Sequence, residues 1–254
     1  MDAASKPRVL CVVPARYAST RFPGKIIASL AGKPLVLHAY ERAKRAQLID
    51  DVIIAADDPR VRDVIVPFGA RVVMTRPEHP TGTDRIAEAV SGEDADIVVN
   101  VQGDEALIDP ATIDAAIRPL LDDPEVMMST ARRRILDPAL VSNPNIVKVI
   151  SDQRGRAIYF SRSVIPHIRD EADRSAEREC YWQHIGLYVY RREFLLRFAG
   201  LPQTPLERLE KLEQLRAVEH GFPIAVIDTE YDGRGVDVPE DLEWARGQLE
   251  VRKD

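Results

Sequence analysis

Short apolar runs alternate with amphipathic segments along the first half of the chain. The runs are rich in Val, Ile, Leu and Ala, which is the pattern of strands buried on both faces. They cover residues 8–15, 51–57, 71–74 and 96–101. The segments between and after them have apolar residues at helical spacing and predict helices over residues 34–48, 59–69, 83–90 and 110–121. This order of elements predicts an α/β fold, in which a mostly parallel sheet is covered by helices.

The pattern becomes less regular after about residue 125. Strand-like stretches recur at longer intervals, over residues 126–133, 145–151, 157–163, 185–192 and 224–229. Residues 168–179 are nearly all charged or small, and they predict an exposed loop. Further helices are predicted over residues 205–221, which end at a glycine, and over residues 239–250, which begin with a proline. We therefore expect one domain over residues 1–254, with an irregular sub-region at about 125–200.

Composition and charge narrow the class of protein. Of the 254 residues, 45 % are apolar, which is typical of a folded protein, and the net charge of −6 argues against nonspecific nucleic-acid binding. No apolar run approaches the roughly 20 residues that span a bilayer, and the first residues lack the layout of a signal peptide. Cys11 and Cys180 are too few for a disulfide framework, and Cys11 lies in an apolar run typical of a core. These features predict a cytoplasmic enzyme or binding protein that uses neither nucleic acid nor membrane.

A loop rich in cations directly follows the first predicted strand. This segment, PARYASTRFPGK over residues 14–25, is neither a dinucleotide fingerprint nor a P-loop, but it contains Arg16, Arg21 and Lys25 together with Ser19. Ligands of open parallel sheets bind beyond the carboxyl ends of the strands, which is where this loop lies. Three cations can pair with the oxygens of a triphosphate, so the loop predicts phosphate binding. The alternative interpretation is a solvated basic loop.

Two aspartates follow other predicted strands. Asp104 comes after the strand over residues 96–101, and Asp237 comes after the last strand. Mg²⁺ typically binds one or two carboxylates together with phosphate oxygens and water, so both residues are candidate metal ligands. An isolated aspartate after a strand is more often a cap or a turn residue. From the residues alone, a cap for the helix beginning at Pro239 is the favoured role of Asp237.

Seven segments of the chain together carry a resemblance to a known family. They are PARYASTRFPGK (14–25), NVQGDEALI (100–108), NPNIVKVI (143–150), IYFSRSVIP (158–166), HIGLYVYR (184–191), PLERLEKLEQLR (205–216) and GVDVPEDL (235–242). In this order they resemble the 3-deoxy-manno-octulosonate cytidylyltransferases, from about residue 8 to residue 250. The first segment is shared in looser form with sialic-acid cytidylyltransferases, whereas QGDE, YFSR, HIGxYxYR and PLExxExLEQLR are more specific.

This resemblance implies a fold, a reaction and an assembly. The fold is a single-domain, Rossmann-like nucleotidyltransferase with a dimerisation insert in the sub-region at about 125–200. The reaction transfers CMP from CTP to the anomeric hydroxyl of 3-deoxy-manno-octulosonate (Kdo), releases pyrophosphate, requires Mg²⁺ and serves lipopolysaccharide biosynthesis in the cytoplasm. The implied assembly is a homodimer.

The resemblance also implies roles for individual residues. The residues that would hold the triphosphate are Arg16, Ser19, Arg21 and Lys25. Those that would contact the cytidine are Thr83, Arg85 and Gln102. Asp104 and Asp237 would hold the metal and, with Lys25, form the catalytic set. The residues that would surround the sugar acid are Arg162, His184, Tyr188, Glu207 and Glu210.

The sugar-side residues have structural alternatives. His184 precedes an alternating apolar stretch, where it would only make a hydrogen bond in the core. Tyr188 would only pack as a strand residue. Glu207, Glu210 and Glu213 recur every third residue, which is more commonly the solvated face of a helix.

Departures from the family pattern leave the choice of sugar open. Ala106 stands where the family usually has proline, which would loosen that loop but leaves the carboxylates in place. Trp182 and Gln183 replace the usual basic residue before His184, on the sugar side, so an 8-amino analogue of Kdo is one alternative substrate. A sialic acid is the other, and HIGLYVYR and PLERLEKLEQLR argue against it. A catalytically inactive nucleotide-binding module is disfavoured because the candidate carboxylates and cations are all present, and a nicotinamide oxidoreductase is disfavoured because no glycine-rich turn follows the first strand.

Overall fold

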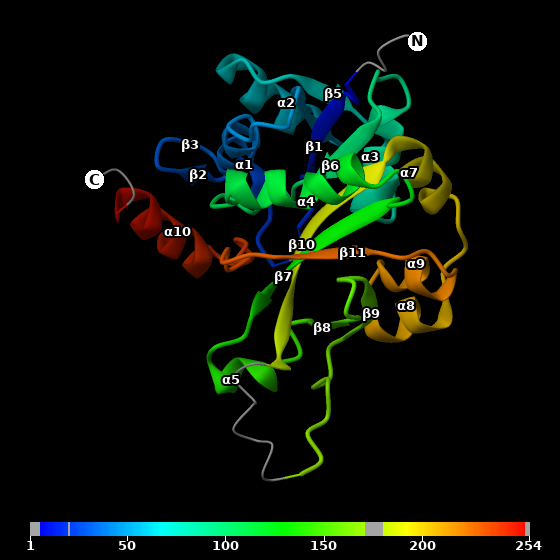
Figure 1. Ribbon diagram of the computed structural model, residues 1–254. Helices are drawn as coiled ribbons and strands as arrows, with labels where there is room; N and C mark the ends of the chain where they lie inside the picture. Colours follow the sequence, from blue (N-terminus) through cyan, green and yellow to red (C-terminus); the bar gives the residue numbers. More distant parts are fainter. Residues whose placement is uncertain (1–5, 20, 171–179, 252–254) are drawn as a thin grey trace, which may run out of the picture.

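A nine-stranded sheet forms the centre of the structure, a computed structural model that describes residues 6–19, 21–170 and 180–251. Its main path has the order β11-β7-β10-β6-β1-β4-β5, and β8 and β9 extend from β10 (Figure 1). The strands β1 (Val9–Ala15), β4 (Asp51–Ala56), β5 (Val72–Met74) and β6 (Ile97–Asn100) are parallel to one another. These are the four strands predicted from the apolar runs of the first half, so the α/β prediction is confirmed.

Helices cover both faces of this parallel half. One face packs on α1 (Leu35–Ala43), α2 (Pro59–Ile65) and α4 (Pro110–Asp122). The other face packs on α3 (Gly82–Val90) and α7 (Arg192–Ala199). Of the described helices, none has the length and apolar character needed to cross a bilayer.

Alternate side chains of β1 enter the two cores. Cys11 and Val13 lie in the core with α1 and α4, whereas Leu10 and Val12 lie in the core with α3 and α7. Both faces of the strand are therefore apolar, which explains why its sequence is a continuous apolar run rather than an alternating one. Cys11 is fully buried, as predicted for a small core residue.

The second half of the chain adds strands of mixed direction. The longest, β10 (Trp182–Arg191), pairs antiparallel with both β6 and β7 (Met128–Arg134). The last strand, β11 (Ala225–Asp228), pairs parallel with β7. The sheet is thus continuous across both halves of the chain.

A hairpin projects from the sheet beside β10. It consists of β8 (Lys148–Ser151) and β9 (Ala157–Ser161), and together with α5 (Pro138–Val141) it extends away from the parallel half (Figure 1). We call these three elements the arm. They fall in the sub-region predicted to be irregular, and of the predicted loop 168–179, residues 171–179 lie outside the described part.

The helix predicted over residues 205–221 is wrong in its continuity. The structure has two short helices, α8 (Pro205–Glu210) and α9 (Leu215–Glu219), and Lys211 between them has a left-handed backbone with φ of 55°. The helical spacing of apolar residues continues through this break, so the pattern does not reveal it. The break allows Arg216 to turn back onto Glu207, a contact between residues nine positions apart in the chain.

Three further elements, β2, β3 and η2, were not predicted because they are only two or three residues long. The helix predicted over residues 34–48 ends at Ala43, and Pro34 belongs to β3 (Lys33–Pro34), which pairs with β2 (Ser29–Leu30). The helix predicted to end at residue 69 passes at Ile65 into the 3₁₀ turn η2 (Val66–Phe68). Elements of two or three residues carry no period that a sequence pattern can show. The final helix, α10 (Pro239–Val251), begins at the predicted proline.

Candidate active site

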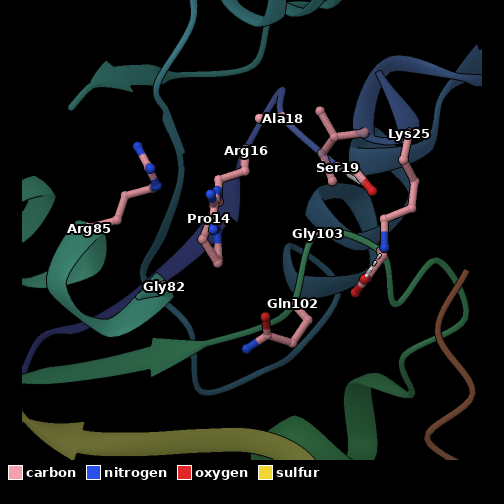
Figure 2. Close-up of a pocket in the computed structure, with 11 residues that line it drawn as sticks. Pro14, Arg16, Ala18, Ser19, Lys25, Gly82, Arg85, Gln102 and Gly103 are labelled. Atoms are coloured by element: carbon pink, nitrogen blue, oxygen red, sulfur yellow. Dashed lines mark hydrogen bonds and ion pairs between the residues drawn. The ribbon is translucent and has the colours of Figure 1, made fainter. Parts of the chain in front are cut away.

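A cavity of about 240 Å³ opens at the carboxyl ends of β1 and β6. Figure 2 shows Ser19 and Lys25 on one side of it, Arg85 on another, and Arg16 and Gln102 between them. The predicted site residues that line it are Arg16, Ser19, Lys25, Arg85, Gln102 and Asp104. The structure therefore brings together most of the residues predicted for the nucleotide, at the edge where parallel sheets bind ligands.

Lys25 joins two carboxylates from distant parts of the chain. Its ammonium lies 2.6 Å from Asp104 Oδ2 and 3.1 Å from Asp237 Oδ1. Arg21 Nη2 lies 3.0 Å from the other oxygen of Asp237. Burial alone would lower the pKa of Lys25, but the two carboxylates outweigh it, so its pKa is raised above the ordinary value. Lys25 is thus a fixed cation.

The carboxylate of Asp237 does not cap α10. The two backbone N–H groups at the start of this segment, those of Asp237 and Val238, donate instead to Asp241 Oδ2 at 3.0 and 3.2 Å. The carboxylate of Asp237 faces Lys25 and Arg21. The capping interpretation that the residues alone favoured is therefore wrong.

Close backbone contacts bring the loops after β6 and β11 together. A Cβ atom at Gly103 would lie 2.7 Å from the carbonyl oxygen of Pro14, so only glycine allows the chain to pass β1 at this point. The Val236 N–H donates to the Asp104 carbonyl oxygen at 3.0 Å. Glu105 accepts a hydrogen bond of 2.6 Å from the Tyr231 hydroxyl, and burial raises its pKa to about 7. These contacts bring the carboxylates of Asp104 and Asp237 to the ammonium group of Lys25.

The donor set at this point fits a hard divalent cation. Asp104 and Asp237 supply carboxylate oxygens, the ligands that Mg²⁺ prefers, beside a cavity that also contains cations suited to phosphates. In the described part of the chain, no three His, Cys, Asp or Glu side chains are grouped so as to hold a metal ion. A metal at this point would therefore take its remaining ligands from the phosphates of a substrate and from water.

Arg85 is fully buried at the wall of the cavity. Its Nη1 donates to Thr75 Oγ1 at 2.6 Å and its Nη2 lies 3.2 Å from Asp57 Oδ2, whereas its Nε has no partner among the described residues. Burial lowers the pKa of Arg85; Asp57 opposes that change, and the nearby charge of Arg16 adds to it. Two cations thus approach each other at the cavity, with Asp57 paired to Arg85 and the charge of Glu88 also acting on it.

The two other residues predicted for the cytidine differ in position. Gln102 lines the cavity, and its amide donates to Asn100 Oδ1 at 3.2 Å. Thr83 does not line the cavity. Its hydroxyl is buried and donates to Glu213 Oε2 at 2.9 Å. Its predicted contact with the nucleotide stays a prediction.

The sugar-side residues form a second group outside the lining of this cavity. Arg162 donates from Nε to the Glu210 carbonyl oxygen at 2.8 Å and from Nη1 to the Pro144 carbonyl oxygen at 3.0 Å. Glu210 in turn accepts hydrogen bonds from the Ser161 hydroxyl and from the backbone N–H of Arg162. These contacts hold the end of β9 against the end of α8.

His184 and Tyr188 belong to a row of aromatic rings along β10. The ring centroid of His184 lies 5.0 Å from that of Phe160 and 5.5 Å from that of Tyr188, which stacks on Tyr190. His184 Nε2 lies 3.0 Å from the hydroxyl of Thr130, and burial lowers the pKa of the imidazole to about 3. The imidazole is therefore neutral at physiological pH and makes the core hydrogen bond expected from the structural alternative.

The three glutamates of the 205–216 segment do not form a solvated face. Glu207 is buried, with both oxygens on Arg216 at 2.6 and 2.9 Å. Glu213 accepts hydrogen bonds from Thr81 and Thr83 at the start of α3. The solvated-face interpretation is wrong because the break between α8 and α9 turns these carboxylates inward. The roles of Glu207 and Glu210 toward a sugar stay predictions.

In the sequence, Asp57 was missed and Glu213 was named only as a member of a solvated helix face. Asp57 follows β4 at the same edge of the sheet as the cavity, so its position after a predicted parallel strand was an available signal. Glu213 had only the spacing shared with Glu207 and Glu210, and no pattern distinguished it from a surface residue.

Comparison with known proteins places this geometry in a family. The family model described as Cytidylyltransferase matches residues 10–227. A 3-deoxy-manno-octulosonate cytidylyltransferase from Solibacter usitatus is 56 % identical over 236 residues, which cover 93 % of this chain and 92 % of the relative. One from Syntrophotalea carbinolica is 53 % identical over 238 residues, covering 92 % of this chain and 95 % of the relative.

Solved structures agree with the sequence relatives. A CMP:2-keto-3-deoxy-manno-octonic acid synthetase complexed with CTP superposes with a TM-score of 0.91 at 39 % identity, covering 96 % of this chain and 99 % of the other. A 4-diphosphocytidyl-2C-methyl-D-erythritol synthase from Anaerococcus prevotii shares only the fold, with a TM-score of 0.64 at 12 % identity over 96 % of this chain and 99 % of the other. The predicted nucleotidyltransferase fold is thus confirmed, and the chain belongs to the 3-deoxy-manno-octulosonate cytidylyltransferase family.

Proposed function

We propose that this chain transfers CMP from CTP to the anomeric hydroxyl of Kdo, giving CMP-Kdo and pyrophosphate, with Mg²⁺ as its cofactor. The observation that carries the proposal is the cavity in which cations of the first loop (residues 14–25) and Arg85 meet the Lys25–Asp104–Asp237 cluster. A second support is that the synthetase structure with a TM-score of 0.91 to this chain was solved with CTP bound. A cytoplasmic role in lipopolysaccharide biosynthesis is part of the same proposal, because CMP-Kdo is an activated sugar acid for that polymer.

The reaction needs no nucleophile from the protein. The sugar hydroxyl oxygen attacks the α-phosphorus of CTP and loses its proton to water, a new P–O bond forms, the bond to the bridging oxygen breaks, and pyrophosphate leaves with the electron pair. Such in-line displacement depends on positioning and on neutralising charge. Arg16, Ser19, Arg21 and Lys25 would bind the phosphates, and Arg85 and Gln102 would position the nucleotide. Mg²⁺ held by Asp104 and Asp237 would supply further neutralisation of phosphate charge.

The sugar acid would bind beside β9, β10 and α8. Its carboxylate requires a cation, and Arg162 is the sugar-side arginine whose guanidinium can bind a carboxylate with two hydrogen bonds. Neutral His184 and the Tyr188 hydroxyl suit the hydroxyl groups of a sugar, because both can donate or accept. Glu210, next to Arg162, would position that arginine.

We also propose that the chain is one domain and works as a homodimer. The continuous nine-stranded sheet supports the single domain. Large apolar side chains are exposed around the arm, at Leu136, Ile158 and Val164. These residues belong to the arm or flank it in the chain, and exposed apolar side chains that form a patch are typical of a protein–protein contact.

The substrate assignment is tested by measuring pyrophosphate release. We expect turnover with CTP and Kdo, and much less with UTP, with a sialic acid, or without Mg²⁺. An 8-amino analogue of Kdo is the second substrate to compare, because Trp182 and Gln183 depart from the family on the sugar side.

The surroundings of Trp182 favour Kdo over this analogue. The guanidinium carbons of Arg132 and Arg134 lie 4.0 and 4.7 Å from the Trp182 ring centroid, and their charges disfavour the ammonium group of the amino sugar. Higher kcat/KM with the amino sugar or a sialic acid would contradict Kdo as the substrate.

The carboxylates are tested by Asp104→Asn and Asp237→Asn. Each change should lower kcat at least about a hundredfold, the scale of losing a main electrostatic stabiliser of a transition state. The matched control is Asp94→Asn, because Asp94 pairs with Arg8 at the surface and lies before β6, at the end of that strand opposite the cavity. Near-normal kcat in either site variant would remove that carboxylate from the mechanism.

The sugar-carboxylate contact is tested by Arg162→Ala. A charge-assisted hydrogen bond contributes about 1.5–3 kcal/mol, so the KM for Kdo should rise roughly ten- to a hundredfold while the KM for CTP stays nearly constant. Arg162→Lys should restore only part of the loss, because an ammonium cannot make the two-pronged contact. The control is Arg191→Ala, since Arg191 also donates only to backbone carbonyls of neighbouring segments in the described structure. If both variants lower the melting temperature and neither changes the KM for Kdo, Arg162 has only a structural role.

The homodimer is tested by light scattering at micromolar concentration. The expected mass is about twice the chain mass of 28.5 kDa. Ile158→Asp should shift the protein toward the monomer, because it places a charge in the apolar contact. The control is Val66→Asp, since Val66 is as exposed as Ile158 but lies outside the arm. A fully active wild-type monomer would contradict the proposal.

A further inference from the structure

Asp57 contacts two separate parts of the nucleotide cavity although it does not line the cavity itself. It follows β4 directly, and its side chain is only 7 % exposed. One carboxylate oxygen accepts a hydrogen bond from the backbone of the first loop, and the other lies beside Arg85 of α3. These two partners are 68 positions apart in the chain, so a single carboxylate joins segments that nothing in the local sequence connects.

The first contact sets the course of the loop that contains the phosphate cations. The Tyr17 N–H donates to Asp57 Oδ1 at 2.9 Å, which orients the peptide between Arg16 and Tyr17. The Tyr17 ring is held as well, because the guanidinium carbon of Arg60 lies 3.6 Å from its centroid. On the loop itself, Gly24 has a left-handed φ of 68° and lies against this ring. Gly24, near the end of the first loop, thus lies against Tyr17, and Asp57 fixes the peptide at the start of that loop.

The second contact places the charge of Arg85. In the described structure, Asp57 is the only carboxylate within ion-pair distance of Arg85, with Nη2 to Oδ2 at 3.2 Å. Arg85 is fully buried, and the charge of Arg16 acts on it from nearby. A buried cation beside a second cation is costly without a counter-charge. Asp57 thus supplies the counter-charge of Arg85, and through the Tyr17 N–H it also holds the backbone next to Arg16.

We propose that Asp57 is a positioning residue for CTP, which prepares the triphosphate site by fixing the first loop at Tyr17 and the guanidinium of Arg85 at the same time. This inference rests on the proposed function, since it takes the cavity to be the CTP site. It assigns Asp57 no contact with the substrate. Preorganised cations cost less conformational entropy when the ligand binds, so the loss of Asp57 should appear in the affinity for CTP.

The experiment compares Asp57→Asn and Asp57→Ala by calorimetric binding of CTP and by steady-state kinetics with both substrates. In Asp57→Asn the amide oxygen still accepts the Tyr17 N–H, but the counter-charge of Arg85 is lost, so the Kd for CTP should rise about tenfold. Asp57→Ala removes both contacts, and the Kd should rise about a hundredfold. The KM for Kdo at saturating CTP should stay within about twofold in both variants, because the sugar-side residues do not contact Asp57.

A matched control comes from Asp50 at the opposite edge of the sheet. Its carboxylate accepts the Val9 N–H at 2.8 Å and pairs with Lys6, so it also combines one backbone contact with one cation. Asp50→Asn and Asp50→Ala should leave the Kd for CTP unchanged. Melting temperatures of all four variants show how much stability each carboxylate contributes.

Three results would overturn the inference. The first is a lowered melting temperature in the Asp57 variants with an unchanged Kd for CTP, which would make Asp57 purely structural. The second is an equal rise in the KM values of both substrates. The third comes from combining Asp57→Asn with Arg85→Gln: the two losses should not multiply if Asp57 acts through Arg85, and fully multiplicative losses would contradict that. If wild-type protein itself fails to bind CTP, the proposed function fails, which is a separate result from any of these.

Discussion

The ammonium of Lys25 between Asp104 and Asp237 is the interaction on which the arrangement of the site depends. It joins the first loop, the loop after β6 and the loop after β11, three segments that meet only because their strands belong to one sheet. Two carboxylates that share one ammonium group repel each other unless that cation lies between them. Lys25 provides that cation in the free protein. On the proposed function, the same carboxylates would have a second partner when a triphosphate and a divalent cation bind.

Charge is distributed unevenly over this acidic protein. The chain carries a net charge of −6, yet Arg16, Lys25 and Arg85 converge on one cavity at the sheet edge. Because three cations and one carboxylate line this cavity, it attracts anions although the molecule as a whole is acidic. Burial makes such cations costly, and two of the three lie beside a carboxylate: Lys25 beside Asp104 and Arg85 beside Asp57.

The residues predicted for the sugar are positioned by other elements than the parallel strands. They come from β9 and β10, which are joined to the sheet by antiparallel pairing, and from α8, which is followed by the break at Lys211. Backbone carbonyls hold Arg162, and Arg216 holds Glu207. His184 is neutral and lies in a row of aromatic rings. If the proposed function is correct, neutral His184 would suit the hydroxyls of the sugar acid and Arg162 would meet its carboxylate.

The sequence by itself determined the parallel half of the fold and the nucleotide side of the site. Buried parallel strands must be apolar on both faces, so β1, β4, β5 and β6 appear as continuous runs, and the rule that ligands bind beyond their carboxyl ends points to Lys25 and Asp104. The family motifs predicted the same residues and added those of the sugar side. Only the tertiary structure decided that Asp237 faces Lys25 rather than capping α10, that Glu213 bonds to α3, and that Asp57 joins Tyr17 to Arg85. These are contacts between segments far apart in the chain. A local pattern shows which residues are buried or helical, but it does not show which carboxylate meets which cation when the strands assemble.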